Sequence, residues 1–184
     1  MPEAKKGKAL EEKLRRIIRD VPDFPKPGIL FKDITPLLGD PELLRETVEA
    51  MAEPFRKDGI SQVLGIESRG FIFGPPLAVA LGAGFVPARK PGKLPSETVS
   101  AEYILEYGVD ALEMHADALA DGARVLIHDD LLATGGTAAA LAELVEGVGG
   151  NVAGFAFLVE LEFLEGRRRL DGYDVHALIS YDGE

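Results

Sequence analysis

Apolar side chains recur at helical spacing near the start of the chain, and this pattern predicts an amphipathic helix. The positions of the apolar stripe are Leu10, Leu14, Ile17, Ile18 and Val21. Three prolines follow, so the stretch "GILFKDITP" at 28–36 is expected to be extended. We interpret about the first 35 residues as a helix and a small extended appendage to the rest of the chain.

A second helix is predicted to begin at Pro41. Asp40 can accept hydrogen bonds from the first free amides of this helix, and a proline suits its first turn. The side chains expected to face the core are Leu44, Val48, Met51 and Phe55. The helix should end near Gly59, and Pro54 should distort its last turn.

Short apolar runs alternate with helical stretches over the rest of the chain. The expected strands are "QVLGI", "GFVPAR", "ARVLIHDD" and "NVAGFAFLVEL", with helices around Leu77–Leu81 and in "TAAALAELVEGVG". Alternation between Thr98 and Tyr107 predicts a half-exposed strand. This order predicts an α/β fold with a mainly parallel twisted sheet flanked by helices. No repeat or linker interrupts it, so 1–184 is expected to be a single domain.

Composition and charge narrow the classes of function. The chain has 184 residues, 46% of them hydrophobic and 28% charged, which is ordinary for a globular protein. A net charge of −11 argues against nucleic acid as a partner, although a few cations could still gather around a small anion. The absence of cysteine excludes disulfides and thiolate metal sites. No apolar stretch approaches the roughly 18 residues of a membrane span, so we expect a cytoplasmic protein without a membrane partner.

The stretch "VLIHDDLLATGGT" at 125–137 combines an apolar strand, two adjacent carboxylates and a turn of small residues. Ligands of open parallel sheets bind beyond the carboxyl ends of the strands, where Asp129 and Asp130 are expected. The Gly-Gly turn would leave the amides of the next helix open to an anion, and Thr134 and Thr137 could add hydroxyl donors. Amides for a phosphate beside carboxylates for vicinal hydroxyls suit a sugar phosphate.

Two other interpretations of this stretch compete with a sugar-phosphate site. An ordinary strand, turn and helix with solvated acids would need no ligand at all. A Rossmann dinucleotide site would need a G-x-G-x-x-G motif after a strand, and the sequence has none in that position.

Taken with four other segments, the stretch resembles the type I phosphoribosyltransferases, and in particular their adenine-specific members. The segments are "FPKPGILFKDITPLL", "GIESRGFIFGPPLA", "ARKPGKLP" and "LEYG". Two positions depart from the family pattern: His128 replaces a branched apolar residue and Lys32 replaces an arginine. The resemblance implies the family fold, with the N-terminal appendage as a base-binding hood. It also implies purine salvage, in which adenine and phosphoribosyl diphosphate give AMP and diphosphate.

The resemblance further implies which residues bind the sugar and the phosphates. Asp129 and Asp130 would bind the ribose hydroxyls. The 5′-phosphate would lie in the loop formed by Ala133, Thr134, Gly135, Gly136 and Thr137. The diphosphate would lie on the loop formed by Glu67, Ser68, Arg69 and Gly70, which should contain a cis Glu67–Ser68 peptide. Cations from a closing loop would come from Arg89, Lys90 and Lys93.

The base would be held by the hood. Phe31 would stack on adenine with Leu131 on its other face, while the Leu30 carbonyl and the Lys32 amide would read N6 and N1. Glu106 would act on the purine ring proton, with Tyr107 beside it in the substrate site. The catalytic groups implied are Glu106, Arg69 and Lys90.

The resemblance also implies a cofactor and an assembly. Mg²⁺ would be held mainly by oxygens of phosphoribosyl diphosphate, without direct protein ligands. The partners would be adenine, phosphoribosyl diphosphate and a second copy of the chain in a homodimer. His115, His128 and His176 lack metal-ligand spacing and are interpreted as structural, and "GRRR" before Leu170 as a solvated helix end.

Two rival functions stay open at this point. A phosphoribosyltransferase for a 6-oxopurine or orotate would share the phosphate-binding motifs, but the hood segment argues against it. A non-catalytic regulator that senses phosphoribosyl diphosphate would need a nucleic-acid-binding module, for which the chain has neither spare length nor a basic patch. Formation of AMP from adenine would separate the first function from both rivals.

Overall fold

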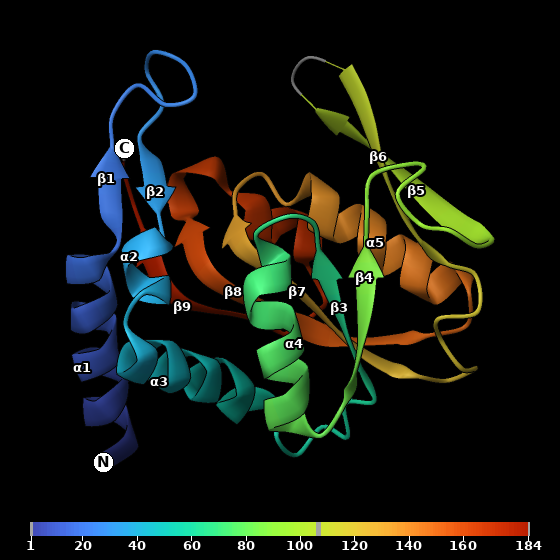
Figure 1. Cartoon of the computed structure of the whole chain (residues 1–184), viewed down its shortest axis with the longest axis horizontal. Helices are drawn as coiled ribbons and strands as arrows, with labels where there is room; N and C mark the ends of the chain where they lie inside the picture. The colour runs from blue at the N-terminus through green and yellow to red at the C-terminus, as the bar shows by residue number, and fades with distance from the viewer. Residues whose placement is uncertain (1, 106–107, 184) are drawn as a thin grey trace.

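The computed structural model describes residues 2–105 and 108–183 and has a five-stranded sheet at its centre. Its strands are β3 (Gln62–Ile66), β4 (Gly84–Ala88), β7 (Arg124–Leu132), β8 (Asn151–Leu161) and β9 (Val175–Tyr181). They lie in the order β4-β3-β7-β8-β9, and every neighbouring pair is parallel (Figure 1). The predicted α/β class with a parallel sheet is confirmed.

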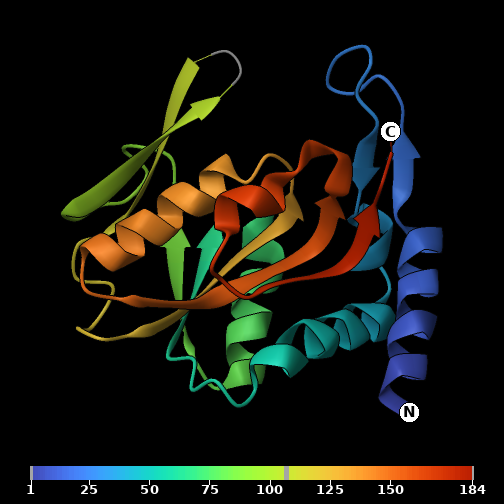
Figure 2. The ribbon, with the colours of Figure 1, turned by 180° about the vertical axis from the view of Figure 1, so that it is seen from behind.

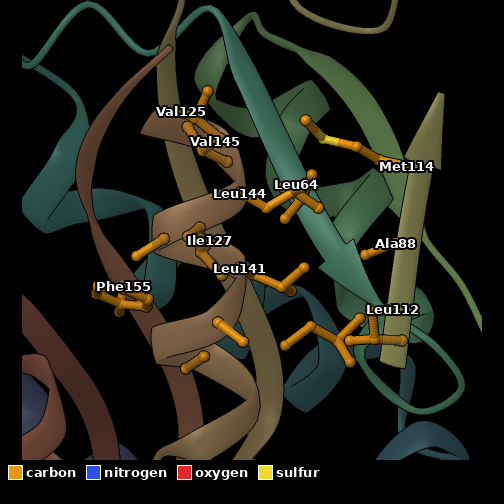
Figure 3. Packing of buried hydrophobic residues seen from close by; sticks show 14 of the residues in the cluster. Leu64, Ala88, Leu112, Met114, Val125, Ile127, Leu141, Leu144, Val145 and Phe155 are labelled. Atoms are coloured by element: carbon orange, nitrogen blue, oxygen red, sulfur yellow. The ribbon is translucent and has the colours of Figure 1, made fainter. Parts of the chain in front are cut away.

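Helices cover both faces of this sheet (Figures 1 and 2). On one face lie α1 (Pro2–Ile17), α3 (Pro41–Ala52) and α4 (Gly70–Leu81), and on the other lies α5 (Gly136–Gly147). Strands buried on both faces need near-continuous apolar runs, which explains the sequences of β3 and β8. Val63 packs in the cluster on the α4 side and the next residue, Leu64, in the cluster on the α5 side (Figure 3).

The N-terminal helix is shorter than its apolar stripe predicts. It ends at Ile17, and Val21 lies instead in β1 (Arg19–Val21), which pairs with β2 (Phe31–Asp33) in an antiparallel ribbon. Pro22 disfavours helix at the residue before it, and β2 offers that residue a strand partner. The predicted stripe is therefore wrong at its last two positions, since Ile18 also lies beyond the helix.

The stretch at 28–36 is extended only in part, because Gly28 lies in a turn with φ 87° and the strand covers Phe31–Asp33. A short helix, α2 (Thr35–Leu38), follows at once, so the expectation of extended chain through Pro36 is wrong. The Asp33 carboxylate accepts from the Thr35 amide at 2.9 Å and from its hydroxyl at 3.0 Å, and a proline suits a first helical turn. These contacts turn the chain into the helix.

The cap of α3 is confirmed. The Asp40 carboxylate accepts from the amides of Glu42 and Leu43 at 3.1 and 2.9 Å. Beyond Ala52 the chain tightens into a 3-10 turn, η1 (Glu53–Phe55), that contains Pro54. Pro54 therefore distorts the chain where predicted, but α3 ends at Ala52 and not near Gly59, so the predicted end of the helix is wrong.

A hairpin stands apart from the main sheet. Its strands are β5 (Thr98–Leu105) and β6 (Gly108–His115), so the strand predicted from Thr98 is confirmed as far as Leu105, while Tyr107 lies outside the described residues. Leu112 and Met114 of β6 join the core beside α5 (Figure 3). The hairpin and the β1–β2 ribbon both rise at the end of the sheet where the parallel strands finish (Figure 1).

The two remaining elements are short 3-10 turns between β8 and β9, η2 (Glu162–Leu164) and η3 (Gly166–Leu170). Leu170 is buried in the core, and Arg167 forms an ion pair with the buried Glu160. All three arginines of "GRRR" are exposed, so the interpretation of this segment as a solvated helix end is confirmed, although Arg167 also pairs with Glu160. None of the helices in residues 2–105 and 108–183 combines the length and apolar composition that a membrane crossing needs.

His128 is fully buried on β7. Its Nδ1 lies 2.8 Å from the Ala156 carbonyl oxygen and must donate to it, because a carbonyl only accepts. Its Nε2 has no hydrogen-bond partner among the described residues, and its ring meets Phe73 edge to face at 6.4 Å. Burial lowers the pKa of His128 to about 4, so this histidine is neutral at pH 7.

This burial predicts a loss of stability in mild acid. The unfolded chain takes up a proton on His128 below about pH 6.5, whereas the folded chain does so only near pH 4. The free energy of unfolding should therefore fall by up to about 3 kcal/mol as the pH drops across that window. Denaturant titrations at several pH values should show a shallower fall for His128→Leu than for the parent chain.

A matched control is available on β9, where His176 is exposed. His176→Leu makes the same substitution at an exposed histidine and controls for the change of residue type. If His128→Leu and His176→Leu both follow the parent curve, proton uptake by His128 does not limit stability.

Candidate functional site

Two carboxylates lie at the carboxyl end of β7. Asp130 is 4% exposed, and its Oδ2 lies 2.9 Å from Nε of Arg69. Burial, and then the charge of Asp130, raise the pKa of Asp129 well above its usual range. Burial also raises the pKa of Asp130, although the Arg69 guanidinium partly offsets that rise. The site therefore holds acceptor groups whose ionised forms would gain from a hydroxyl donor or a positive charge nearby.

The loop at 67–70 connects β3 to α4 and lies directly against these carboxylates. A Cβ added to Gly70 would come within 2.9 Å of Oδ1 of Asp129, so only glycine allows this approach without a shift. The peptide between Glu67 and Ser68 is cis, as predicted. The predicted loop and the carboxylate pair thus share one edge of the sheet.

The turn before α5 forms a small pocket of about 70 Å³. Gly135 occupies the helix cap with φ 77°, in the left-handed region, and no side chain caps the amides that follow. Free amides at a helix start attract anions. The residues that line the pocket include all five predicted for the phosphate, with neighbours before and after them: Asp129, Leu131, Leu132, Ala133, Thr134, Gly135, Gly136, Thr137, Ala138 and Phe157.

The hood reaches this edge through Arg69. Its guanidinium lies 4.7 Å from the ring centre of Phe31 on β2, and its Nη1 donates to the Lys32 carbonyl at 3.4 Å. Phe24 meets Phe31 edge to face at 5.1 Å. The aromatic ring predicted to stack on a base, Phe31, therefore lies beside Arg69, which is predicted to bind the diphosphate.

The Lys32 side chain is buried between other partners. Its ammonium donates to Asp20 at 2.7 Å and lies 3.9 Å from the ring centre of Tyr181 on β9. These contacts fix the side chain between β1 and β9. A lysine replaces the family's usual arginine here, and Asp20 and the ring of Tyr181 bind its ammonium group.

The predicted cationic loop follows β4. Nε of Arg89 lies 2.7 Å from Glu67, and its Nη1 donates to the Lys93 carbonyl at 3.2 Å. The Lys90 ammonium pairs with Asp110 and also donates to the Tyr103 hydroxyl at 3.2 Å. Burial alone would lower the pKa of Lys90, but the hydrogen bonds to these two groups raise it.

Several contributors to this edge were not predicted. Asp110 and Tyr103 hold Lys90, and the Glu113 carboxylate accepts from the Gly92 amide at 3.1 Å. The alternation of "AEYILEY" indicated a strand but not the hairpin partner that places these groups. Glu106, with Tyr107, lies outside the described residues. Leu30 and Leu131 are half-buried, and Ser68 and Lys93 are exposed. The roles predicted for these four residues in substrate binding stay predictions.

Known proteins are similar to this chain in both sequence and fold. Residues 37–179 match the model of the phosphoribosyl transferase domain. An adenine phosphoribosyltransferase of Solibacter usitatus is 59% identical, over 92% of this chain and 98% of its own length. The chain belongs to the adenine phosphoribosyltransferase family. The resemblance read from its motifs is thereby confirmed.

Solved structures of adenine phosphoribosyltransferases agree. The enzyme of Rhodothermus marinus is 58% identical with a TM-score of 0.91, over 95% of this chain and 99% of that one. The Saccharomyces cerevisiae enzyme, 43% identical with a TM-score of 0.88, was crystallised with adenine and D-2,5-dideoxy-2,5-imino-altritol 1,6-bisphosphate. The two chains match over 94% of this one and 99% of that one. The expected family fold is confirmed.

Proposed function

We propose that the chain joins N9 of adenine to C1′ of phosphoribosyl diphosphate, giving AMP and diphosphate. As the new bond forms, the bond from C1′ to the diphosphate oxygen breaks, the diphosphate leaves with the electron pair, and adenine loses a ring proton. The observation that supports this most is that the open start of α5, the Asp129–Asp130 carboxylates and the loop at 67–70 lie at one edge of the sheet.

The sugar phosphate would bind to β7 and the turn after it. The free amides before α5 would hold the 5′-phosphate, with the hydroxyls of Thr134 and Thr137 as further donors. Asp129 and Asp130 would accept from the ribose hydroxyls. Positive charge developing on the ribosyl ring would favour the ionised forms of these acids, which burial disfavours, and the two carboxylates would in turn stabilise that charge.

The diphosphate would bind on the other side of the carboxylates. Arg69 and the amides at 67–70 lie there, with Arg89 held next to them by Glu67. Lys90 is paired with Asp110 in this conformation, so acting on the leaving group would require it to exchange that carboxylate for a phosphate. Lys93 would join it from the same loop.

Mg²⁺ would accompany the diphosphate. The described residues contain no cluster of three His, Cys, Asp or Glu side chains that could hold a metal. Asp130 is engaged by Arg69. The ion would be held mainly by the oxygens of the substrate, where it would neutralise charge on the leaving group.

Adenine would bind between the hood and the sheet edge. Phe31 would stack on one face of the base and Leu131 on the other, while the Leu30 carbonyl and the Lys32 amide would read its N6 and N1. The Arg69 guanidinium now covers one face of Phe31. Glu106 would act on the ring proton, with Tyr107 next to it in the substrate site.

A homodimer is supported by α4. The twelve residues of this helix include no polar side chain, and Val79 is 81% exposed. Ile72, Pro75 and Pro76 are exposed as well. A helix that is apolar all round is usually covered on both sides, and a second copy of this chain would cover this face. Because α4 begins at the loop at 67–70, the second copy would lie next to the substrate site.

Three further expectations remain proposals. The chain would act as a single domain over 1–184, with both core clusters built on the same sheet. It would work in the cytoplasm and without nucleic acid. The rival base specificities would use the same phosphate groups and differ at the hood, while a regulator would lack turnover.

Base choice tests the function directly. Adenine offers an N6 donor and an N1 acceptor, and hypoxanthine reverses both, so two buried groups of the hood would be left mismatched. At roughly 1–3 kcal/mol each, kcat/KM should favour adenine by about 30-fold to more than 10⁴-fold. The measurement is AMP or IMP formation at limiting base. Comparable rates with the two bases would reject adenine specificity, and no turnover with either would favour the regulator.

Lys32→Ala tests the main-chain part of this choice. The lysine ammonium contacts Asp20 and Tyr181, so its loss should raise KM for adenine without changing the ratio of kcat/KM between the bases. A switch of preference in Lys32→Ala would show that the side chain, not the main chain, selects the base.

Asp129→Asn and Asp130→Asn test the sugar site. Each change removes a charged acceptor worth roughly 1.5–3 kcal/mol, so kcat/KM for phosphoribosyl diphosphate should drop about 10- to 100-fold while the circular dichroism spectrum is kept. Glu165→Gln, an exposed carboxylate, is the control. Two aspartate variants with parental kcat/KM would remove both residues from the site.

Val79→Glu tests the dimer. A charge at the most exposed position of α4 should shift the chain from dimer to monomer in sedimentation velocity. Phe163→Glu, an exposed apolar position outside α4, should leave the dimer intact. A parent chain that sediments as a monomer at micromolar concentration would contradict the proposal.

A further inference from the structure

The turn before α5 is pressed against η3 by main chain alone. A Cβ added to Gly166 would come within 2.1 Å of the Ala133 oxygen, and one added to Gly135 within 2.3 Å of the Gly166 oxygen. Two glycines therefore allow two backbone segments to touch where any other residue would separate them. The shape of the turn at 133–137 depends on where η3 lies.

The place of η3 is set by a fork of hydrogen bonds from Arg167. Its Nε lies 3.0 Å from Oε1 of Glu160, its Nη2 donates to the second carboxylate oxygen, and its Nη1 donates to the Val175 carbonyl at 2.7 Å. The Glu160 residue is 5% exposed. One side chain thus ties η3 to both β8 and β9.

The Glu160–Arg167 pair also lies beside the start of the turn at 133–137. Glu160 on β8 is in register with Leu132 on β7, the residue directly before Ala133. The turn is consequently held at its start through β8 and at its middle through Gly166. Only the Glu160 side of this ion pair is buried, since the Arg167 side chain is 48% exposed, but the two-pronged geometry of the pair allows one orientation.

We infer that Glu160 and Arg167 are positioning residues that hold the turn at 133–137 in the shape that binds a 5′-phosphate. The inference rests on the proposed function, since that assigns the turn to the phosphate. Neither side chain lines the pocket at this turn. Their effect is carried by the Gly166–Gly135 contact and concerns the phosphate alone.

The test compares binding of AMP with binding of adenosine, which lacks the phosphate. The variant is the double change Glu160→Met with Arg167→Met, which replaces the pair by apolar side chains of similar length and leaves no buried charge. Titration calorimetry should show AMP bound about 10- to 100-fold more weakly than by the parent chain, with adenosine binding unchanged. Circular dichroism melting checks that the variant is folded.

The neighbouring turn offers a matched control. Arg168 and Glu165 form an exposed ion pair at 2.8 Å, with side chains 77% and 55% exposed. The double change Glu165→Met with Arg168→Met replaces this neighbouring pair in the same way. That variant should bind AMP and adenosine as tightly as the parent chain does. A second variant, Gly166→Ala, acts on the contact itself and should weaken AMP alone, whereas Gly147→Ala, which meets nothing within 4 Å, should weaken neither.

The outcomes separate the inference from the function it rests on. A parent chain that binds AMP no more tightly than adenosine contradicts the phosphate site itself. If the parent prefers AMP and the Glu160–Arg167 variant keeps that preference, the positioning role is overturned. Equal losses for AMP and adenosine in that variant also overturn it, because the damage would then extend beyond the phosphate.

Discussion

The ion pair between Arg69 and Asp130 is the contact on which the arrangement of the site depends. Asp130 belongs to the central strand β7, and Arg69 belongs to the loop after the neighbouring strand β3. The pair therefore joins the ends of two adjacent parallel strands. The same guanidinium reaches Phe31 and the Lys32 carbonyl in the hood. A single side chain therefore links a segment from the beginning of the chain to the sheet edge.

This linkage explains how an acidic chain can serve an anionic substrate. The net charge is −11, yet cations collect where β3, β4 and β7 end, each beside a carboxylate: Arg69 beside Asp130, Arg89 beside Glu67 and Lys90 beside Asp110. In these ion pairs the acids hold the cations in place and limit their repulsion. Phosphate oxygens can then compete for cations that are already near the site.

Much of the fold was predictable because the periodicity of the core is strong. The strands of the main sheet are apolar runs bounded by turns, and the cap at Asp40 needs only its immediate neighbours. The error at 35–38 was local, because the Asp33 carboxylate two residues earlier turns that segment into a helix. The error at Val21 has another cause, because Val21 pairs with Phe31 on a second strand. Local spacing cannot reveal a partner ten residues away.

The site was predictable to the extent that its chemistry lies in continuous motifs. The stretch at 125–137 and the loop at 67–70 carry both the residue types and their order. By contrast, Asp110 faces Lys90 only because the hairpin folds back, and Arg167 faces Glu160 only because two 3-10 turns reverse the chain. Such pairs consist of ordinary surface residue types, and nothing near them in sequence distinguishes them.

The edge strand β4 has a consequence for how copies of the chain can meet. It is five residues long and contains Pro87, which has no amide to offer an incoming strand. Just past its end, the main chain of Arg89 is already bonded to that of Glu113 at 2.8 and 2.7 Å. Growth of the sheet by addition of a foreign strand is thus discouraged on this side, so the chain can keep an apolar helix face without also presenting a template for aggregation.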